Sequence, residues 1–159
     1  MTGSPPPADA GVRVDAFLAD SVSVDGGKLH TQGAGWNLLL TEAIPTIHGR
    51  LALALLFHVP VNDGGASHAL EIRLEDPAGE EIPLIVAPPD APPSERRIGG
   101  SFTLDPPPVD SPLEEQLFAS GINVDGIPFE LAGRHRFVVN VDGADAAEVL
   151  FAVVVREAE

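Results

Sequence analysis

Apolar and polar residues alternate most regularly over Arg50 to Asp76, where two apolar runs flank the polar segment NDGGAS. Alternate positions from Leu51 to Val61 are apolar, and alternate positions from His68 to Leu74 continue the pattern. Successive side chains of a strand point to opposite faces of a sheet, so the pattern predicts two strands, each with one buried face. We expect them to form a hairpin that pairs Phe57 with Ile72, because a slip of one residue would bury charged side chains.

A second long hairpin is predicted near the end of the chain, from Arg134 to Arg156. Its apolar positions from His135 to Val141 match those from Val149 to Val155 if the loop spans residues 142–148. A two-residue Asp-Gly turn is the alternative, but it would place Glu148 opposite Phe137 on the buried face. We therefore predict the longer loop.

Turn residues divide the rest of the chain into short strands. The DGG segment at residues 25–27 predicts a further hairpin, and Pro83 predicts an edge position for its strand. Ser111, followed by proline and then Glu114, forms a capping box that predicts one short helix near residues 112–120, ended by Gly121. The pattern as a whole predicts an all-β fold: a single immunoglobulin-like or C2-like antiparallel β-sandwich of about eight or nine strands.

Length and composition are typical of one domain. The 159 residues favour a single sandwich over residues 12–159, preceded by a disordered, proline-rich tail over residues 1–11. The tail lacks the basic start and apolar segment of a signal peptide, and no apolar run is long enough to span a bilayer. The chain has no cysteine, so we expect a reducing compartment, the cytoplasm, and no association with a membrane.

The charge of the chain narrows the choice of partners. Twenty-four acidic and nine basic residues give a formal net charge of -15. Such a surface repels phosphate backbones and anionic lipids, since binding to them depends on lysine and arginine. We therefore expect no nucleic-acid partner.

Candidate catalytic and metal-binding residues are present, but without a recognisable pattern. The five histidines form no HxxxH or HxH pair, and no serine lies in a GxSxG motif, so no enzyme and no cofactor is predicted. Loop carboxylates offer an alternative, a small-ligand or Ca²⁺ site, although none forms a DxDxDG loop and aspartate is also favoured in turns. The aspartates in predicted turns are Asp63, Asp76, Asp90, Asp105, Asp110, Asp125, Asp142 and Asp145.

Apolar residues also occupy outward positions of both long hairpins, where a solvent-facing strand normally carries charge. Either these rows are covered within the chain, or they form an exposed patch for a protein partner or a second copy. We therefore predict a non-enzymatic interaction or assembly module. The predicted surface consists of Ala52, Ala54, Leu56 and His58 on the first hairpin, and Val138, Leu150, Ala152 and Val154 on the second.

Five segments of the chain together carry a resemblance to known proteins: Phe17 to Asp20, Gly27 to Leu29, Gly33 to Trp36, His68 to Ile72, and Asp76 to Gly79. They resemble a family of uncharacterised bacterial proteins of unknown function. The resemblance implies an immunoglobulin-like sandwich, and the last hairpin, with GRHRF and VDG, is similar to that of many such modules. The family carries no known activity, so the resemblance transfers no functional residues.

Overall fold

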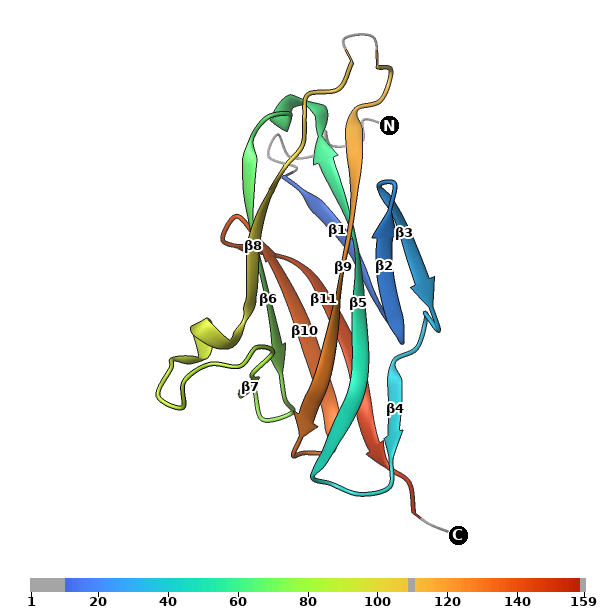
Figure 1. Ribbon diagram of the computed structural model, residues 1–159, viewed down its shortest axis with the longest axis vertical. Coiled ribbons are helices and arrows are strands. Elements are labelled where there is room, and N and C mark those ends of the chain that lie inside the picture. The colour runs from blue at the N-terminus through green and yellow to red at the C-terminus, as the bar shows by residue number, and fades with distance from the viewer. Residues whose placement is uncertain (1–10, 109–110, 158–159) are drawn as a thin grey trace, which may run out of the picture.

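The computed structural model describes residues 11–108 and 111–157, which form an all-β sandwich as predicted. Within these residues the chain forms eleven strands, more than the eight or nine expected (Figure 1). The predicted tail lies outside the described residues except for Gly11, and so does Asp110.

One sheet of the sandwich has three strands in the order β1-β5-β9, all antiparallel. Its central strand β5 pairs along most of its length with β9, which places Ala54 between Phe17 of β1 and Gly121 of β9. The strands are β1 (Arg13–Ala19), β5 (Thr46–Pro60) and β9 (Glu115–Phe129).

The second sheet has the order β4-β11-β10-β6-β7, and β8 pairs with β6 on the same side as β7. Its edge strand β4 runs parallel to β11, which corrects the expectation of a wholly antiparallel sandwich. The strands are β4 (Leu38–Thr41), β6 (Ser67–Glu75), β7 (Glu81–Ile82), β8 (Ile98–Thr103), β10 (Gly133–Val141) and β11 (Ala144–Val155).

A separate hairpin of β2 (Ser21–Asp25) and β3 (Lys28–Gln32) lies beside the three-stranded sheet, with β4 next to it along the same side of the molecule (Figure 1). Gly26 and Gly27 form its turn with positive φ angles of 57° and 73°, a conformation that glycine adopts without strain. The hairpin predicted from the DGG segment is therefore confirmed.

The core lies between the two sheets and contains the buried faces that alternation predicts. Leu51, Leu53, Leu55, Phe57 and Val59 of β5 are fully buried. Ile72 and Leu74 of β6 and Phe137 and Val139 of β10 face them from the other sheet. The assignment of inward positions was thus correct for both long apolar segments.

The predicted pairing of β5 with β6 is wrong. The two strands belong to different sheets and are joined by a loop that contains the 3₁₀ turn Val61–Asp63. Phe57 lies opposite Val14 and Phe118, while Ile72 lies opposite Val139 and Ile98. Alternation assigns side chains to a buried face, but two strands that share a core can face each other across it instead of lying edge to edge.

The terminal hairpin exists, but its predicted loop is wrong. β10 and β11 are joined at Asp142 and Gly143, and Phe137 lies opposite Val149. The register shifts between Val139 and Asn140, so that one extra residue on β11, Ala146, is accommodated as a bulge. This extra residue moves Glu148 to the outward face, which removes the objection to the short turn.

The helix predicted near residues 112–120 is absent, because residues 115–120 belong to β9. Ser111 does accept a hydrogen bond from the Leu113 backbone N–H, at 3.4 Å, but no helix follows. From Glu115 onward the backbone pairs with β5, and this long ladder overrides the local capping signal.

Candidate functional site

The outward row of β5 is covered by the chain itself. Ala52 and Ala54 are fully buried, and they form a small apolar cluster with Ala19, Val22 and partly buried Leu29. Val22 and Leu29 belong to the β2–β3 hairpin, which therefore lies over the outer face of the three-stranded sheet. The prediction that Ala52 and Ala54 belong to an exposed surface is wrong.

The hairpin is held against β9 by close packing and by two hydrogen bonds. A Cβ atom at Gly121 would lie only 2.6 Å from both methyl groups of Val22, so glycine is needed for this approach. Next along the same face, the Asn123 side chain accepts from the Val22 N–H at 3.0 Å and donates to the Val22 carbonyl at 2.9 Å. The Asn123 amide thus takes the place of a neighbouring strand as the hydrogen-bond partner of the Val22 backbone.

His58 and Leu56 lie further along the outer face of β5 and are partly buried. His58 Nε2 is 2.7 Å from Asp15 of β1, and Nδ1 is 2.9 Å from Glu115 of β9. Hydrogen bonds to Glu115 and to Asp15 raise the pKa of His58 above its ordinary value. The ring therefore links the three strands of this sheet.

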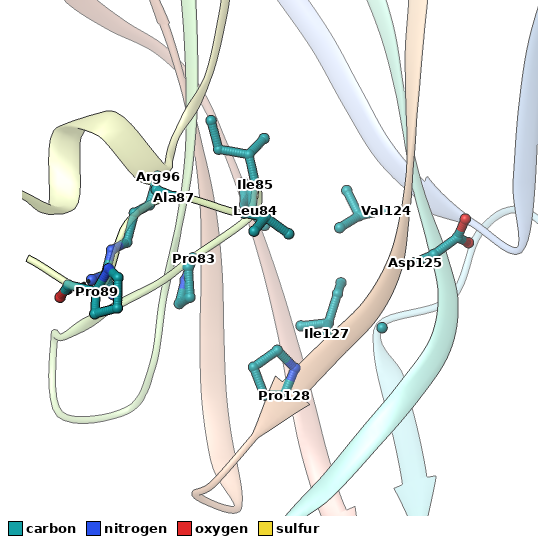
Figure 2. Close-up of a pocket in the computed structure, with 12 residues that line it drawn as sticks. Pro83, Leu84, Ile85, Ala87, Pro89, Arg96, Val124, Asp125, Ile127 and Pro128 are labelled. Atoms are coloured by element: carbon teal, nitrogen blue, oxygen red, sulfur yellow. Dashed lines mark hydrogen bonds between the residues drawn. The ribbon is translucent and has the colours of Figure 1, made fainter. Parts of the chain in front are cut away.

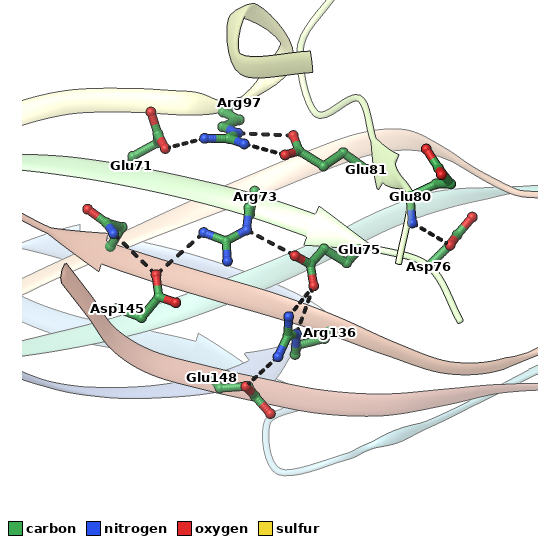
Figure 3. Close-up of polar contacts among 11 residues, drawn as sticks. Glu71, Arg73, Glu75, Asp76, Glu80, Glu81, Arg97, Arg136, Asp145 and Glu148 are labelled. Carbon is green, nitrogen blue, oxygen red and sulfur yellow. Dashed lines mark hydrogen bonds and ion pairs between the residues drawn. The ribbon is translucent and has the colours of Figure 1, made fainter. Parts of the chain in front are cut away.

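Val138 points to the outer face of the six-stranded sheet but is only 2% exposed. Arg73 of β6 and Glu148 of β11 are its direct cross-strand neighbours. Their side chains belong to a network of ion pairs that covers this half of the face (Figure 3). Val138 is therefore not part of an open surface either.

The network consists of two groups of ion pairs, in which three arginines pair with five carboxylates on β6, β10, β11 and their neighbours (Figure 3). Arg97 belongs to the smaller group, and Arg73 and Arg136 belong to the larger one. Glu75 is its central acid, since it accepts from Arg136 Nε at 2.9 Å and from Arg73 Nε at 3.1 Å. Burial raises the pKa of Glu75, but the hydrogen bonds from Arg136 and Arg73 outweigh it, and the pKa lies below its ordinary value. The remaining pairs are Arg73 with Asp145, Arg97 with Glu71 and Glu81, and Arg136 with Glu148.

The other half of the same face is apolar and open. Leu150 and Val154 of β11 are 43% and 40% exposed, and Ala152 between them is partly exposed. Leu38 and Leu40 of the edge strand β4 extend this surface, since they lie opposite Ala152 and Val154 and are 51% and 54% exposed. We call these five residues the open patch.

Three residues of the open patch, Leu150, Ala152 and Val154, were predicted from the sequence, whereas Leu38 and Leu40 were not. The triplet LLL at residues 38–40 carried a usable signal, because three successive leucines on a strand put apolar side chains on both faces. Leu39 is the buried member of the three.

A hollow of about 450 Å³ opens within the open patch. Its lining includes Leu38, Leu150 and Ala152, together with Arg134 of β10. Ala152 lies directly between Leu38 and Arg134 in the register of the sheet. Its short side chain forms the floor, and the longer neighbours form the rim.

A second groove, of about 350 Å³, lies between β9 and the segment that follows β7 (Figure 2). Leu84 and Ile85 line one side, and Val124, Ile127 and Pro128 line the other. Its one arginine, Arg96, donates to the Pro89 carbonyl at 3.1 Å. The guanidinium points toward Pro89 and away from β9 in Figure 2, so the side chains that face each other across the groove are mainly apolar.

Two further histidines, His68 and His135, pack against aromatic rings of the core. His135 is fully buried among Phe129 and Phe151, its Nδ1 lies 3.0 Å from the Gly133 carbonyl, and burial lowers its pKa. His68 is stacked on Phe102, and its Nδ1 lies 2.7 Å from Asp142.

The loop aspartates mostly bond to nearby groups. Asp76 accepts from the backbone N–H groups of Ala78 and Glu80, Asp125 pairs with Arg50, and Asp142 accepts from the Ala69 N–H. Across residues 11–108 and 111–157, no three histidine or acidic side chains gather as a metal site requires. The described part of the chain also contains no helix long and apolar enough to cross a membrane.

The comparisons with known proteins find a family of unknown function and distantly similar solved structures. No curated protein matches the chain. An alkylpurine DNA glycosylase from Pseudomonas fluorescens, solved with DNA that contains an abasic-site analogue, has a TM-score of 0.44 at 9% identity. The match covers 93% of this chain and 32% of the glycosylase, so this chain spans about a third of that protein.

An immunoglobulin-like protein from Pseudomonas aeruginosa has a TM-score of 0.37 at 14% identity, with 92% of this chain and 99% of that protein covered. Neither similarity is close enough to transfer a function. The resemblance to a family without known activity is confirmed over nearly the whole sandwich. The family of unknown function DUF6941 matches residues 14–154, and the chain belongs to that family.

Proposed function

We propose that this protein is a non-enzymatic β-sandwich module that binds a protein partner or a second copy through the open patch. The proposal rests on a difference between the outward faces of the two sheets. The chain covers Ala52 and Ala54 with its own hairpin, whereas Leu38, Leu40, Leu150 and Val154 stay exposed side by side. Contiguous exposed apolar residues at a sheet edge are typical of an interaction site, since their burial against a partner is favourable.

The composition supports a protein partner in the cytoplasm. The net charge of -15 disfavours nucleic acid and anionic lipid, and the absence of cysteine suits a reducing compartment. Some of the histidine and aspartate side chains, namely those of His58, His68, Asp76 and His135, bind to nearby backbone or side-chain groups, which supports a role without catalysis.

The test compares a patch variant with a matched control. In the double variant Leu40→Lys with Val154→Lys, two charges are placed on the open patch. In the control Ile47→Lys, one charge replaces an exposed apolar residue on the other sheet, where Ile47 is 73% exposed. All three proteins are tagged, purified from their native cells and measured by size exclusion with light scattering.

We expect the wild type and the Ile47→Lys control to form the same oligomer or complex, and the double variant to elute as a free monomer. A wild-type protein that is a free monomer, or an assembly that survives in the double variant, would contradict the proposal.

A further inference from the structure

The hollow in the open patch has the shape to receive one apolar side chain. Ala152 forms its floor, with Leu38 on one neighbouring strand and Arg134 on the other. Leu150 and Val154 lie two positions before and after Ala152 on the same face of β11. An incoming aliphatic or aromatic side chain would therefore meet Leu38, Leu150 and Ala152 together with Arg134.

Arg134, like Arg96 and Arg156, has no acidic partner among the described residues. Within the described part of the chain it is exposed and forms no ion pair, although acidic residues outnumber basic ones by 24 to 9. Five other arginines do pair with carboxylates: Arg13, Arg50, Arg73, Arg97 and Arg136. An arginine left without a carboxylate at the rim of an apolar hollow is complementary to an acidic group on a ligand.

We propose that the hollow binds an extended segment of a partner protein in which an aliphatic or aromatic residue adjoins an aspartate or glutamate. The apolar side chain fills the space over Ala152, and the carboxylate accepts hydrogen bonds from the Arg134 guanidinium. This inference rests on the proposed function, since it names the chemistry of the partner that the open patch binds. Burial of the apolar side chain supplies affinity, and the arginine fixes the orientation of the segment.

The same charges argue against a second copy as the occupant. A symmetric dimer places the same residues on both sides of its interface. Face-to-face contact of two open patches would bring Arg134 of one copy toward Arg134 of the other. None of the five residues of the open patch is acidic, so the like charges would gain no partner from the patch itself.

A random twelve-residue peptide library displayed on phage tests the proposal. It is selected on the immobilised wild-type protein and, in parallel, on Ala152→Leu, which fills the hollow. Labelled copies of the enriched peptides are then titrated by fluorescence anisotropy. The titrations use the wild type, Arg134→Gln, and the control Lys28→Gln, which removes an exposed lysine from the distant β2–β3 turn.

We expect enriched peptides in which an acidic residue adjoins an aliphatic or aromatic one. Arg134→Gln should weaken their binding about fivefold, as removal of an exposed charge pair does, and Ala152→Leu should weaken it more than tenfold. Lys28→Gln should bind as the wild type does.

The proposal is overturned if no peptide is enriched on the wild type over Ala152→Leu, or if Arg134→Gln binds as tightly as the wild type. The result also separates the two proposals. Enriched apolar peptides without an acidic residue that lose binding to the Leu40→Lys, Val154→Lys protein would overturn the partner chemistry but leave the open patch as the interaction surface.

Discussion

The outward row of β5 and the outward row of β11 lie on opposite sheets, and only the first is covered. Ala52 and Ala54 are buried beneath the β2–β3 hairpin, whereas Leu150 and Val154 flank a hollow that opens to the surface. The difference lies in the size of the side chains. A hairpin can lie flat on alanine and glycine, but leucine and valine hold a second layer of backbone away from the sheet.

A third outward position shows another kind of cover. Val138 is shielded by the charged side chains of the network and not by another segment of backbone. The outer face of the six-stranded sheet is thus divided between a half covered by ion pairs and the open patch. The small residues Ala52 and Ala54 are thus covered by backbone, Val138 is covered by ion pairs, and the larger apolar residues of the open patch stay exposed.

The same substitution, placed in both rows, tests most strongly whether they differ in cover. Ala54→Leu should lower the free energy of unfolding by about 3 kcal/mol, because the added atoms collide with the hairpin. Ala152→Leu should change it by less than about 0.5 kcal/mol, because its side chain enters the open hollow. Urea denaturation of both variants measures the difference, and equal losses would show that the two rows have the same surroundings.

A smaller loss is expected where the hairpin approaches β9. Gly121→Ala should destabilise the fold by about 2 kcal/mol, because the new Cβ atom would overlap the methyl groups of Val22. The control is Gly100→Ala on β8, where an added Cβ meets no atom within 4 Å. The urea midpoint of the control should stay close to the wild-type value. If both variants lose the same stability, contact with Val22 is not the cause of the loss at Gly121.

Loss of the hydrogen bonds to the hairpin should cost less still. Asn123→Ala removes both bonds to the Val22 backbone and should lower the stability by about 1 kcal/mol. Amide hydrogen exchange at Val22 should become faster. In the control Asn140→Ala, which removes a bond to Asp145, Val22 should exchange at the wild-type rate. Unchanged exchange in Asn123→Ala would show that packing alone holds the hairpin.

The stability contributed by the ion pairs around Val138 should depend on pH, unlike the stability contributed by packing of the β2–β3 hairpin. The folded-state pKa of Glu75 lies below its ordinary value of 4.5. The stability that Glu75 contributes is therefore fully present above about pH 4.5 and is lost as the pH falls through the folded-state pKa. Glu75→Gln lacks this contribution, so its deficit from the wild type, measured by urea denaturation, should shrink below pH 4.5. A deficit that is constant from pH 7 to pH 3 would exclude this linkage.

The inward faces of the sandwich could be predicted from the sequence, but the strand partners could not. Alternation correctly buried Phe57 and Ile72, yet it could not show that they meet across the core in different sheets. The bulge at Ala146 was equally hidden, because it depends on cross-strand packing of β10 and β11. The capping signal at Ser111 was local and was outweighed by pairing with β5.

The candidate site was predicted in part for similar reasons. Leu150, Ala152 and Val154 were identified from their outward positions, whatever their strand partners. Ala52 and Ala54 were included wrongly, because the cover comes from a hairpin distant in the sequence. Three successive leucines indicated apolar side chains on both faces, but Leu38 and Leu40 could not be placed beside Ala152 and Val154, because the parallel pairing of β4 with β11 leaves no trace in local sequence.

The most direct test of the central claim is site-specific photo-crosslinking in the native cells. A photoreactive amino acid is introduced at Leu150 in the open patch, and in separate proteins at Glu71 in the charged half of the same face and at Ile47 on the other sheet. If the open patch is the interaction surface, we expect a discrete crosslinked protein adduct from position 150 and none from positions 71 and 47. The absence of an adduct at position 150, or the same adduct from all three positions, would contradict it.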